Sequence, residues 1–576
     1  MNMQVFKYKN FVDFMTGVSD WYEKNTDSEG RCVCTKHHVE HIGKTVYSIG
    51  IDSFLYEETG EQKYLDRIRV RTLRTIGLQT TGKSWQVFAP DFGNKWNMSQ
   101  FTIDTGACVD MLVTVLEKHR ELFTHSELEA IESAVAVTTD SLLIEKAVDL
   151  PPTNQRLWGA TGLASAYRLN PLEPRKQALL KSLVNSEMEF RSDGSIPYVS
   201  DFSGYGMPEA AADITPYYHS RHISFLWQIL DVVPELTSEY IESLLKASDF
   251  LIGLHQANGI KSMVLETKRW YFLSDYEVAS NSYDVNAFMR AYEYTNDGKY
   301  LHYALSSLSL LMQHQDASGA VNDHKRHGSN FQCQYFWSSH TVWLVKIAQS
   351  LKKADGFEYS FPHGISSIYP EAGLAQLANE AVSLMVRGSK TPHDACLGPT
   401  IGGGSMIYAG FQKSNYSNRL NPRELTGNWH SKIRPSIFYF EFSEWKNIKA
   451  MMYYALIELR GLHVKGFFER LQYLVFNSVS FSKHYCSAFT TIVSMEFKED
   501  GALVVSGGSI STAQGERYPG VMLERMYHID NGKLVVEEKI TSISDEKLKL
   551  KYRFPENSRI IEHQIDFVQY EITYSF

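Results

Sequence analysis

The sequence predicts an α+β chain in two parts, an N-terminal array of helical hairpins followed by a C-terminal antiparallel β-sandwich. From about residue 10 to 355, apolar residues recur at helical spacing with little strand-like alternation. After about residue 360 the pattern changes to short alternating runs rich in β-branched and aromatic residues, separated by Gly, Asn and Asp. A length of 576 residues agrees with two domains. We therefore expect one domain over residues 1–360 and a second over 361–576.

Helices are expected wherever apolar residues repeat with this period. The stretches are 47–56, 109–118, 126–147, 157–168, 223–233, 240–255, 285–294, 300–313 and 341–351. Two connectors, 58–65 and 294–301, resemble each other: each ends one helix in a Gly-containing turn and starts another with Lys-Tyr-Leu. Recurrent hairpins of this kind indicate a closed or solenoid-like array of helix pairs.

Strands are expected in the second part. The alternating runs are 381–387, 404–411, 437–442, 490–497, 502–506, 533–543 and 547–554. Asp530-Asn531-Gly532, between two such runs, predicts a tight hairpin. The stretch 445–476 fits either helix or long strands.

Composition and charge narrow the range of functions. The net charge is −9 and no long basic run occurs, which argues against nucleic acid as the main partner. No segment is apolar enough to span a bilayer, and the N-terminus lacks the apolar core of a secretory signal. We expect a soluble, cytoplasmic protein as written, or a periplasmic or secreted one if an export signal was removed. The sequence leaves the oligomeric state open.

The cysteines raise the question of a metal. Cys32 and Cys34 lie close to His37, His38 and His41, which suggests zinc. This spacing matches no common structural zinc pattern, so we favour a solvated helix face with reduced thiols. No cofactor is therefore expected, and a structural divalent metal stays open as the alternative.

The segment 215–222 carries the strongest functional signal. Thr215 suits an N-cap and Pro216 suits the first helical position, so a helix should start here. Polar and aromatic side chains occupy its opening turns: Tyr217, Tyr218, His219, Arg221 and His222. A helix N-terminus is partly positive and presents free N–H groups, which suggests proton transfer near neutral pH or recognition of an anion.

A second helix start follows two prolines at 151–152 and carries Asn154 and Arg156. If both helices belong to one inner ring, their N-termini share a rim and the two motifs converge on one cleft. Simpler roles stay open: Asn154 as an N-cap, Arg156 as a solvated side chain, and Tyr217, Tyr218, His219 and His222 as packing or helix-surface groups.

These motifs resemble those of the heparinase II/III-like and alginate-lyase-like polysaccharide lyases. The family's Asp-Gly-Ser…Tyr-His segment is similar to residues 193–195 followed by 216–219, and its Asn-bearing helix is similar to residues 153–164. Gln155 stands where the family often has His after this Asn. The resemblance implies an (α/α) toroid of helical hairpins, and a sandwich-loop His for which His393 and His430 are candidates.

The resemblance also implies β-elimination on a uronic-acid-containing glycan, an anionic polysaccharide or oligosaccharide. Asn154 and either Arg156 or His219 would neutralise the uronate carboxylate, which makes the proton on C5 acidic. Tyr218 would act as the base, as the acid toward the leaving oxygen, or as both.

The other candidates for substrate contact lie in polar and aromatic segments, where cations pair with anionic groups and aromatic rings stack on sugars. They are Tyr217, Arg221, His222, Tyr283, His327, Gln334, His340, Trp96, His393 and His430.

Three alternatives stay open on the same scaffold. A glycoside hydrolase would need two carboxylates across a cleft. The available ones are Asp193, Glu209, Asp213 and Asp284. A uronate C5-epimerase would abstract the same proton and return one to the opposite face. A non-catalytic glycan-binding or assembly protein would keep the scaffold without turnover.

Overall fold

The structure is a computed structural model. It describes residues 3–34, 40–80, 82–85, 95–150, 153–197, 214, 216–255, 261, 278–322, 333–360, 364–388, 402–411, 428–430, 485–487, 490, 492, 494–511, 517–518, 520–530, 532–542, 550–555, 558–564 and 566–572.

Helices fill the first part of the chain, as the periodicity predicts. They are α1 (Tyr8–Lys24), α2 (Ile42–Thr45), α3 (Tyr47–Thr59), α4 (Gln62–Gly77), α5 (Lys95–Lys118), α6 (His125–Thr138), α7 (Ile144–Asp149), α8 (Thr153–Leu169), α9 (Glu173–Glu187), α10 (Pro216–Leu230), α11 (Thr237–Gly253), α12 (Val278–Thr295), α13 (Gly298–Gln313), α14 (Gln334–Ser339), α15 (Val342–Val345) and α16 (Ala348–Lys353). A π turn over Thr139–Leu143 joins α6 to α7. The helix expected at 341–351 is two short helices, α15 and α16.

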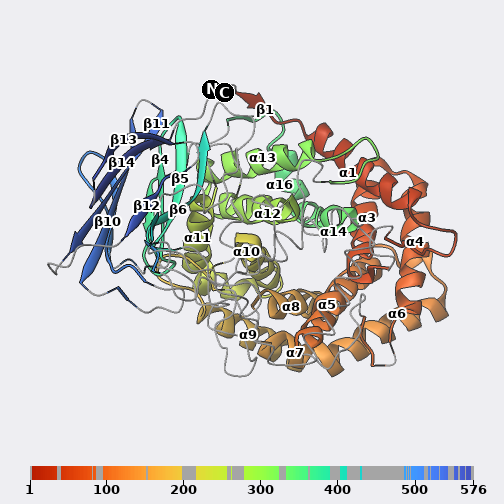
Figure 1. The fold of residues 1–576 in the computed structure, drawn as a ribbon. Helices are drawn as coiled ribbons and strands as arrows, with labels where there is room; N and C mark the ends of the chain where they lie inside the picture. The colour runs from red at the N-terminus through yellow and green to blue at the C-terminus, as the bar shows by residue number, and fades with distance from the viewer. Residues whose placement is uncertain are drawn as a thin grey trace, which may run out of the picture.

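The helices form a closed ring of hairpins (Figure 1). Contacts between neighbours run from α3 through α5, α8, α10, α12 and α15 and return to α3, which closes the inner ring. The outer helices α4, α6, α9, α11 and α13 each pack against the inner helix next to them in sequence. In α8 every residue from Thr153 to Ala166 is buried, as expected for a helix covered on all sides.

The two similar connectors are the hairpin turns that the sequence predicts. Helix α3 ends at Gly60, whose φ of 70° lies in the left-handed region where glycine carries no steric penalty. After α12, Asn296 adopts a φ of 56°, which asparagine tolerates better than most residues. Each turn reverses the chain and places the following helix on the outside of the ring.

Three glycines allow the inner helices α5 and α8 to approach closely. A Cβ on Gly106 would lie 2.4 Å from the carbonyl oxygen of Trp158, and one on Gly162 would lie 2.6 Å from the carbonyl oxygen of Gly106. A Cβ on Gly159 would lie 2.3 Å from Thr102 Cγ2. Two of these neighbours are backbone atoms, which cannot move aside at low energetic cost. The close contact therefore fixes the position of α8, the helix that carries Asn154, against α5.

We expect Gly162→Ala to destabilise the chain by about 1–3 kcal/mol, because the new methyl group overpacks a backbone contact. Gly77→Ala is the matched control: this helical glycine is exposed, and a Cβ added to it would meet no atom within 4 Å. The control should be neutral or stabilising by up to about 1 kcal/mol. Urea unfolding of both variants measures the difference, and equal stabilities would contradict the close packing of α5 and α8.

Antiparallel sheets follow the helices. One sheet has the order β3 (Ser367–Tyr369), β4 (Leu374–Ala378), β5 (Val382–Arg387), β6 (Ser405–Phe411). A second has the order β13 (Ser558–His563), β14 (Phe567–Ile572), β11 (Lys533–Ser542), β10 (Val521–Asp530), β9 (Leu503–Gly508), β8 (Ser494–Phe497). Two small sheets pair β12 (Lys551–Arg553) with β7 (Asn428–His430) and β1 (Gln4–Val5) with β2 (Glu358–Tyr359).

The predicted hairpin is confirmed, because Asp530 pairs with Lys533 where β10 turns into β11. The run expected as a strand at 437–442 and the ambiguous stretch 445–476 lie outside the described residues. The two larger sheets share one hydrophobic core, in which Leu384 and Met406 from the first meet Val505 and Tyr527 from the second. Arg525 on β10 is fully buried, with its Nε 3.1 Å from Glu538 Oε2 on the paired strand β11, and its Nη1 donates to Ser405 Oγ on β6 of the first sheet at 2.9 Å.

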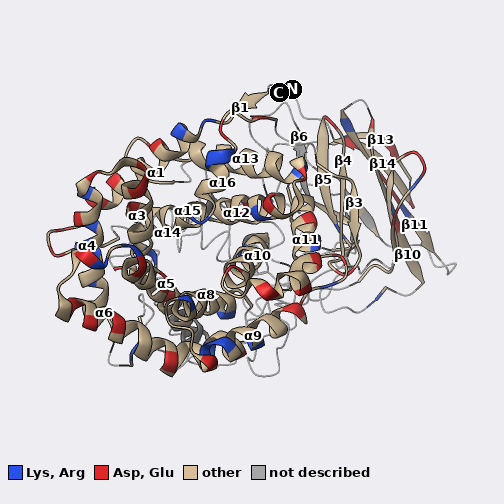
Figure 2. Ribbon diagram, turned by 180° about the vertical axis from the view of Figure 1, so that it is seen from behind, with Lys and Arg blue, Asp and Glu red and all other residues tan. Residues whose placement is uncertain are grey.

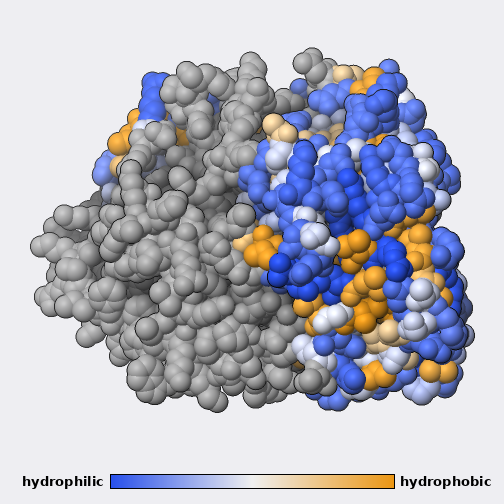
Figure 3. Space-filling model, turned by 90° about the vertical axis from the view of Figure 1, so that its right-hand side faces the viewer, coloured by the Kyte–Doolittle hydropathy of each residue, from blue (hydrophilic) through white to orange (hydrophobic). Residues whose placement is uncertain are grey.

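The described surface of the ring carries charged side chains of both signs and hydrophobic side chains (Figure 2 and Figure 3). Figure 2 shows acidic and basic side chains interspersed over the outer helices α4, α6 and α9. The described part of the face in Figure 3 is mostly hydrophilic, with hydrophobic side chains scattered among polar ones. Among the described residues, no helix has both the length and the apolar character needed to cross a bilayer.

Candidate functional site

The two helix starts that the sequence singles out lie side by side. Helix α8 begins at Thr153 and α10 begins at Pro216, and the two helices pack against each other. The beginnings of the two helices are electrostatically coupled, since the charge of Arg156 in the first turn of α8 contributes to lowering the pKa of His222 in the second turn of α10. The two motifs therefore meet at one place in the ring.

On α8, Arg156 is held by a structural ion pair. Its Nη2 lies 2.7 Å from Glu189 Oε2, and its Nη1 donates to the carbonyl oxygen of Leu150 at 3.0 Å. Thr153 also donates to Glu189 Oε2, at 2.7 Å. Asn154 is 1% exposed, and its Oδ1 has no hydrogen-bond partner among the described residues. An orphaned polar atom at a buried helix start is unusual for a purely structural residue.

On α10, both histidines are buried and neutral at pH 7. Burial lowers the pKa of His219 to about 4, and its Nε2 donates to the carbonyl oxygen of Ala247 at 3.0 Å. Burial also lowers the pKa of His222 well below its usual value, and the charges of Arg156 and Arg221, together with that of His219 once it is protonated, add to the effect. Neither ring nitrogen of His222 has a partner among the described residues.

This burial predicts an acid-sensitive fold. His219 binds its proton in the unfolded chain near pH 6.5 but in the folded chain only near pH 4, so stability is full above pH 6.5 and is lost as the pH falls toward 4. The loss from this residue is about 3 kcal/mol. In urea unfolding at pH 7 and pH 4.5, His219→Gln should lose less stability on acidification than the unchanged chain. The same loss in both would contradict the buried, neutral His219.

Seven side chains form what we term the cation–aromatic cluster. They come from α2, α8, α10, α12 and α14, and one comes from the residue that directly follows α14. The members are Lys44, Trp158, Tyr218, Arg221, Tyr283, Phe336 and His340. The Arg221 guanidinium lies 5.5 Å from the ring centre of Tyr218 and 4.8 Å from that of Tyr283. Its Nη2 lies 3.4 Å from His340 Nδ1.

Two cations share the ring of Trp158 in this cluster. Lys44 Nζ lies 4.1 Å from the ring centre and the Arg221 guanidinium lies 5.8 Å from it. Burial lowers the pKa of Lys44 to about 8; the charge of Asp104 opposes this shift and that of Arg221 adds to it. Tyr218 is only partly buried, whereas Arg221 is 1% exposed. Tyr218 and Phe336 are the two partly exposed members of the cluster, and of these only Tyr218 carries a group that can transfer a proton.

Sequence reasoning finds four members of the cluster and misses three. Tyr218, Arg221, Tyr283 and His340 are predicted site residues that the fold brings together. Trp158 lies within the predicted Asn-bearing helix and Phe336 lies between the candidates Gln334 and His340, but neither residue is itself predicted for the site. Lys44 lies in a four-residue helix, too short to show any periodicity.

The remaining candidates fall into three groups. Gln334 lies on α14, and its side-chain Nε2 donates a hydrogen bond to Asp316 Oδ2 at 3.1 Å. His327 and His393 lie outside the described residues, and for Tyr217, Trp96 and His430 only the backbone is described.

The two described carboxylates that are candidates for a hydrolase, Asp193 and Asp284, make structural contacts within the protein. Asp284 is fully buried, 2.6 Å from Lys261 Nζ and 3.4 Å from His255 Nε2. Burial works to raise its pKa, but these two neighbours lower it to about 2. Asp193 accepts from the backbone N–H of Ala372 at 2.9 Å and closes a turn with Ser195. Glu209 and Asp213 lie outside the described residues.

The expectation of a solvated helix face around Cys32 and Cys34 is wrong. Both are buried, at 4% and 1% exposure, and Cys32 lies in a β-bridge with Thr26. Cys34 lies beside His41 and Cys333. His37 and His38 lie outside the described residues.

Comparison with known proteins gives structural likenesses only. No protein-family model matches the sequence, and no curated protein matches it. Heparinase III is 11% identical with a TM-score of 0.45, covering 99% of this chain and 83% of its own. A polysaccharide lyase is 9% identical with a TM-score of 0.45, covering 60% and 98%. A family 88 glycosyl hydrolase from Bacteroides vulgatus is 10% identical with a TM-score of 0.44, covering 60% and 99%.

Proposed function

We propose that this chain is a polysaccharide lyase that cleaves a uronic-acid-containing glycan by β-elimination. The observation that supports this most is the cation–aromatic cluster, in which the partly exposed Tyr218 lies beside the buried Arg221. We also propose that the helical part ends near residue 360 and that the two packed sheets form a β-sandwich.

The cluster has the properties of a carboxylate site. Lys44 and Arg221 are both buried and lie close enough for the charge of one to lower the pKa of the other. The charge of Asp104 also acts on Lys44 and opposes this shift. Charges attract strongly where water is scarce, so we propose that a uronate carboxylate binds beside Lys44 and Arg221, with the rings of Trp158 and Tyr283 bordering the sugar.

This assignment differs from the one that the resemblance implies. His219 is neutral at pH 7 and Arg156 is paired with Glu189, so neither provides net positive charge to a substrate. We assign neutralisation of the carboxylate to Arg221 and Lys44. Asn154 keeps its proposed role of donating from Nδ2 to the carboxylate, and its buried Oδ1, which makes no hydrogen bond within the described part of the chain, would accept one from a sugar hydroxyl.

Tyr218 would carry both proton transfers. A cation close to a tyrosine would favour its phenolate form, and the Arg221 guanidinium lies 5.5 Å from the ring centre of Tyr218. The phenolate oxygen takes the proton from C5, and the C5–H electrons form the C4–C5 double bond as the C4–O bond breaks. The phenol then returns its proton to the leaving oxygen, so the products are an unsaturated uronate and a glycan with a free hydroxyl.

The test is a panel of uronate polysaccharides incubated with the full chain. The 4,5-unsaturated product absorbs in the ultraviolet, so its formation is followed directly. A rise in absorbance with at least one polymer is expected. Saturated fragments would favour a hydrolase, and solvent deuterium at C5 without cleavage would favour an epimerase. Binding without any reaction would favour a glycan-binding protein.

A further inference from the structure

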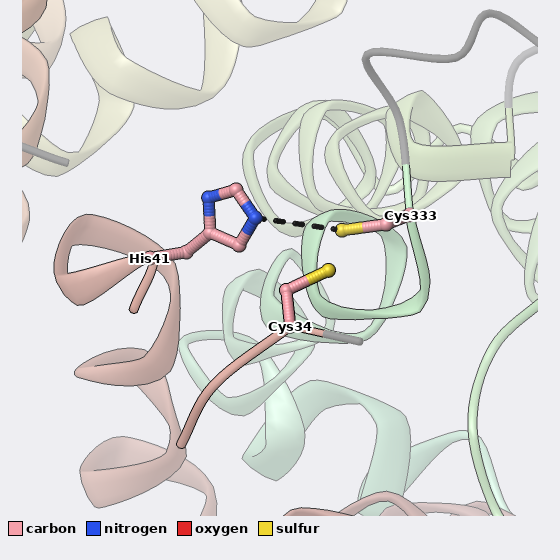
Figure 4. A group of neighbouring side chains, drawn as sticks. All are labelled: Cys34, His41 and Cys333. Carbon is pink, nitrogen blue, oxygen red and sulfur yellow. Dashed lines mark hydrogen bonds between the residues drawn. The ribbon is translucent and has the colours of Figure 1, made fainter. Parts of the chain in front are cut away.

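We propose that Cys34, His41 and Cys333 form a zinc site that joins the start of α2 to the start of α14. Their ligand atoms all lie within 4.8 Å of one another, and all three residues are buried. His41 Nε2 lies 3.8 Å from Cys333 Sγ, and Figure 4 shows the sulfur of Cys34 pointing toward this pair.

The donor set and the spacing both suit zinc. Two thiolates and one imidazole are ligands that Zn²⁺ prefers, at about 2.3 Å for sulfur and about 2.0 Å for nitrogen. In a tetrahedron these bonds separate neighbouring ligand atoms by about 3.5–3.8 Å. The 3.8 Å between His41 Nε2 and Cys333 Sγ is close to the nitrogen–sulfur value of about 3.5 Å, and the sulfur of Cys34 lies within 4.8 Å of both atoms. A ligand other than these three side chains would complete the tetrahedron.

The site would act on two helices that are too short to be stable alone. His41 immediately precedes α2, and Cys333 immediately precedes α14. These helices have four and six residues, well below the length at which a helix is stable on its own. They contact each other, and they carry Lys44 and Phe336 of the cation–aromatic cluster. A metal bound at both helix starts would therefore position that cluster.

The surroundings of the site agree with this role. Near the same junction, Tyr22 on α1 donates from its hydroxyl to the carbonyl oxygen of Tyr335 at 3.2 Å, and Trp21 packs on the Tyr335 ring at 4.6 Å between centres. Ring closure thus depends on contacts between segments about 300 residues apart. Binding would release the thiol protons to solvent, so affinity should fall at acidic pH.

The experiment measures metal content of the full-length chain, purified under reducing conditions without chelator. Elemental analysis should find one zinc per chain. After exchange with Co²⁺, a thiolate-to-cobalt charge-transfer band and intense visible bands should report tetrahedral coordination. Cys34→Ser and Cys333→Ser should each lose the zinc and the cobalt band. Cys32→Ser and Cys108→Ser are matched controls, because both cysteines are buried outside the trio, and both should retain the metal.

Removing the zinc should also lower the midpoint of thermal unfolding, and adding zinc back should restore it. The cobalt spectrum of the unchanged chain tests the site even if a variant fails to fold. A reduced, folded chain that takes up neither zinc nor cobalt would overturn the proposal. So would a Cys34–Cys333 disulfide found by peptide mapping without reductant in the freshly purified chain. None of these readouts depends on lyase activity.

Discussion

Tyr218→Phe is expected to lower kcat on the cleaved polysaccharide by roughly 10²–10⁴-fold while leaving KM within a few-fold. The substitution removes only the phenolic oxygen, which we assign to both proton transfers. The ring that packs beside Arg221 remains, so the carboxylate site should keep its shape. A loss confined to kcat would distinguish a group that transfers protons from one that only binds substrate.

Tyr294→Phe is the control for this experiment. Tyr294 lies near the end of α12 and is 52% exposed, outside the cluster. It should keep the activity of the unchanged chain. If Tyr218→Phe is folded and as active as this control, Tyr218 is not the proton-transfer group and the proposed mechanism is wrong.

Arg221→Met is expected to lower kcat/KM by roughly 10²–10³-fold, because it removes a buried charge from the place where the enolate-like transition state develops negative charge. Methionine fills a similar volume without the charge. Arg221→Lys should recover part of the activity, since the charge returns without the planar guanidinium that lies over Tyr283. A purely structural arginine would not show this graded response.

Arg120→Met controls for the loss of an arginine. Arg120 is half exposed and pairs with Glu132 on the outer surface of the ring. Thermal unfolding of each variant separates a folding defect from a catalytic one. Folded Arg221→Met with kcat/KM within about threefold of the Arg120→Met control would exclude Arg221 from carboxylate neutralisation.

The local parts of the site could be predicted from sequence. Pro216 and Thr153 mark helix starts through short-range rules, and both starts stand where those rules place them. How deeply the side chains at these helix starts are buried could not be predicted. His219 and His222 look like titrating groups in the sequence, but burial in the inner ring makes them neutral.

The non-local parts could not be predicted. Lys44 gives no periodic signal because its helix is one turn long, and its place beside Trp158 depends on closure of the ring. Cys333 stands 292 positions after His41, so the zinc pattern sought within the Cys32–Cys34 segment lacked one ligand. Sequence patterns identify individual helices and turns, but they do not show which distant segments of the chain come into contact.

Mass spectrometry of the reaction products tests the central claim most directly. Elimination at Tyr218 predicts oligosaccharides whose new non-reducing end carries a C4–C5 double bond and which are one water lighter than the corresponding hydrolysis products. These products should appear with the unchanged chain and be absent with Tyr218→Phe. Saturated oligosaccharides, each carrying the added water, would show that the chain cleaves by hydrolysis and would contradict the account.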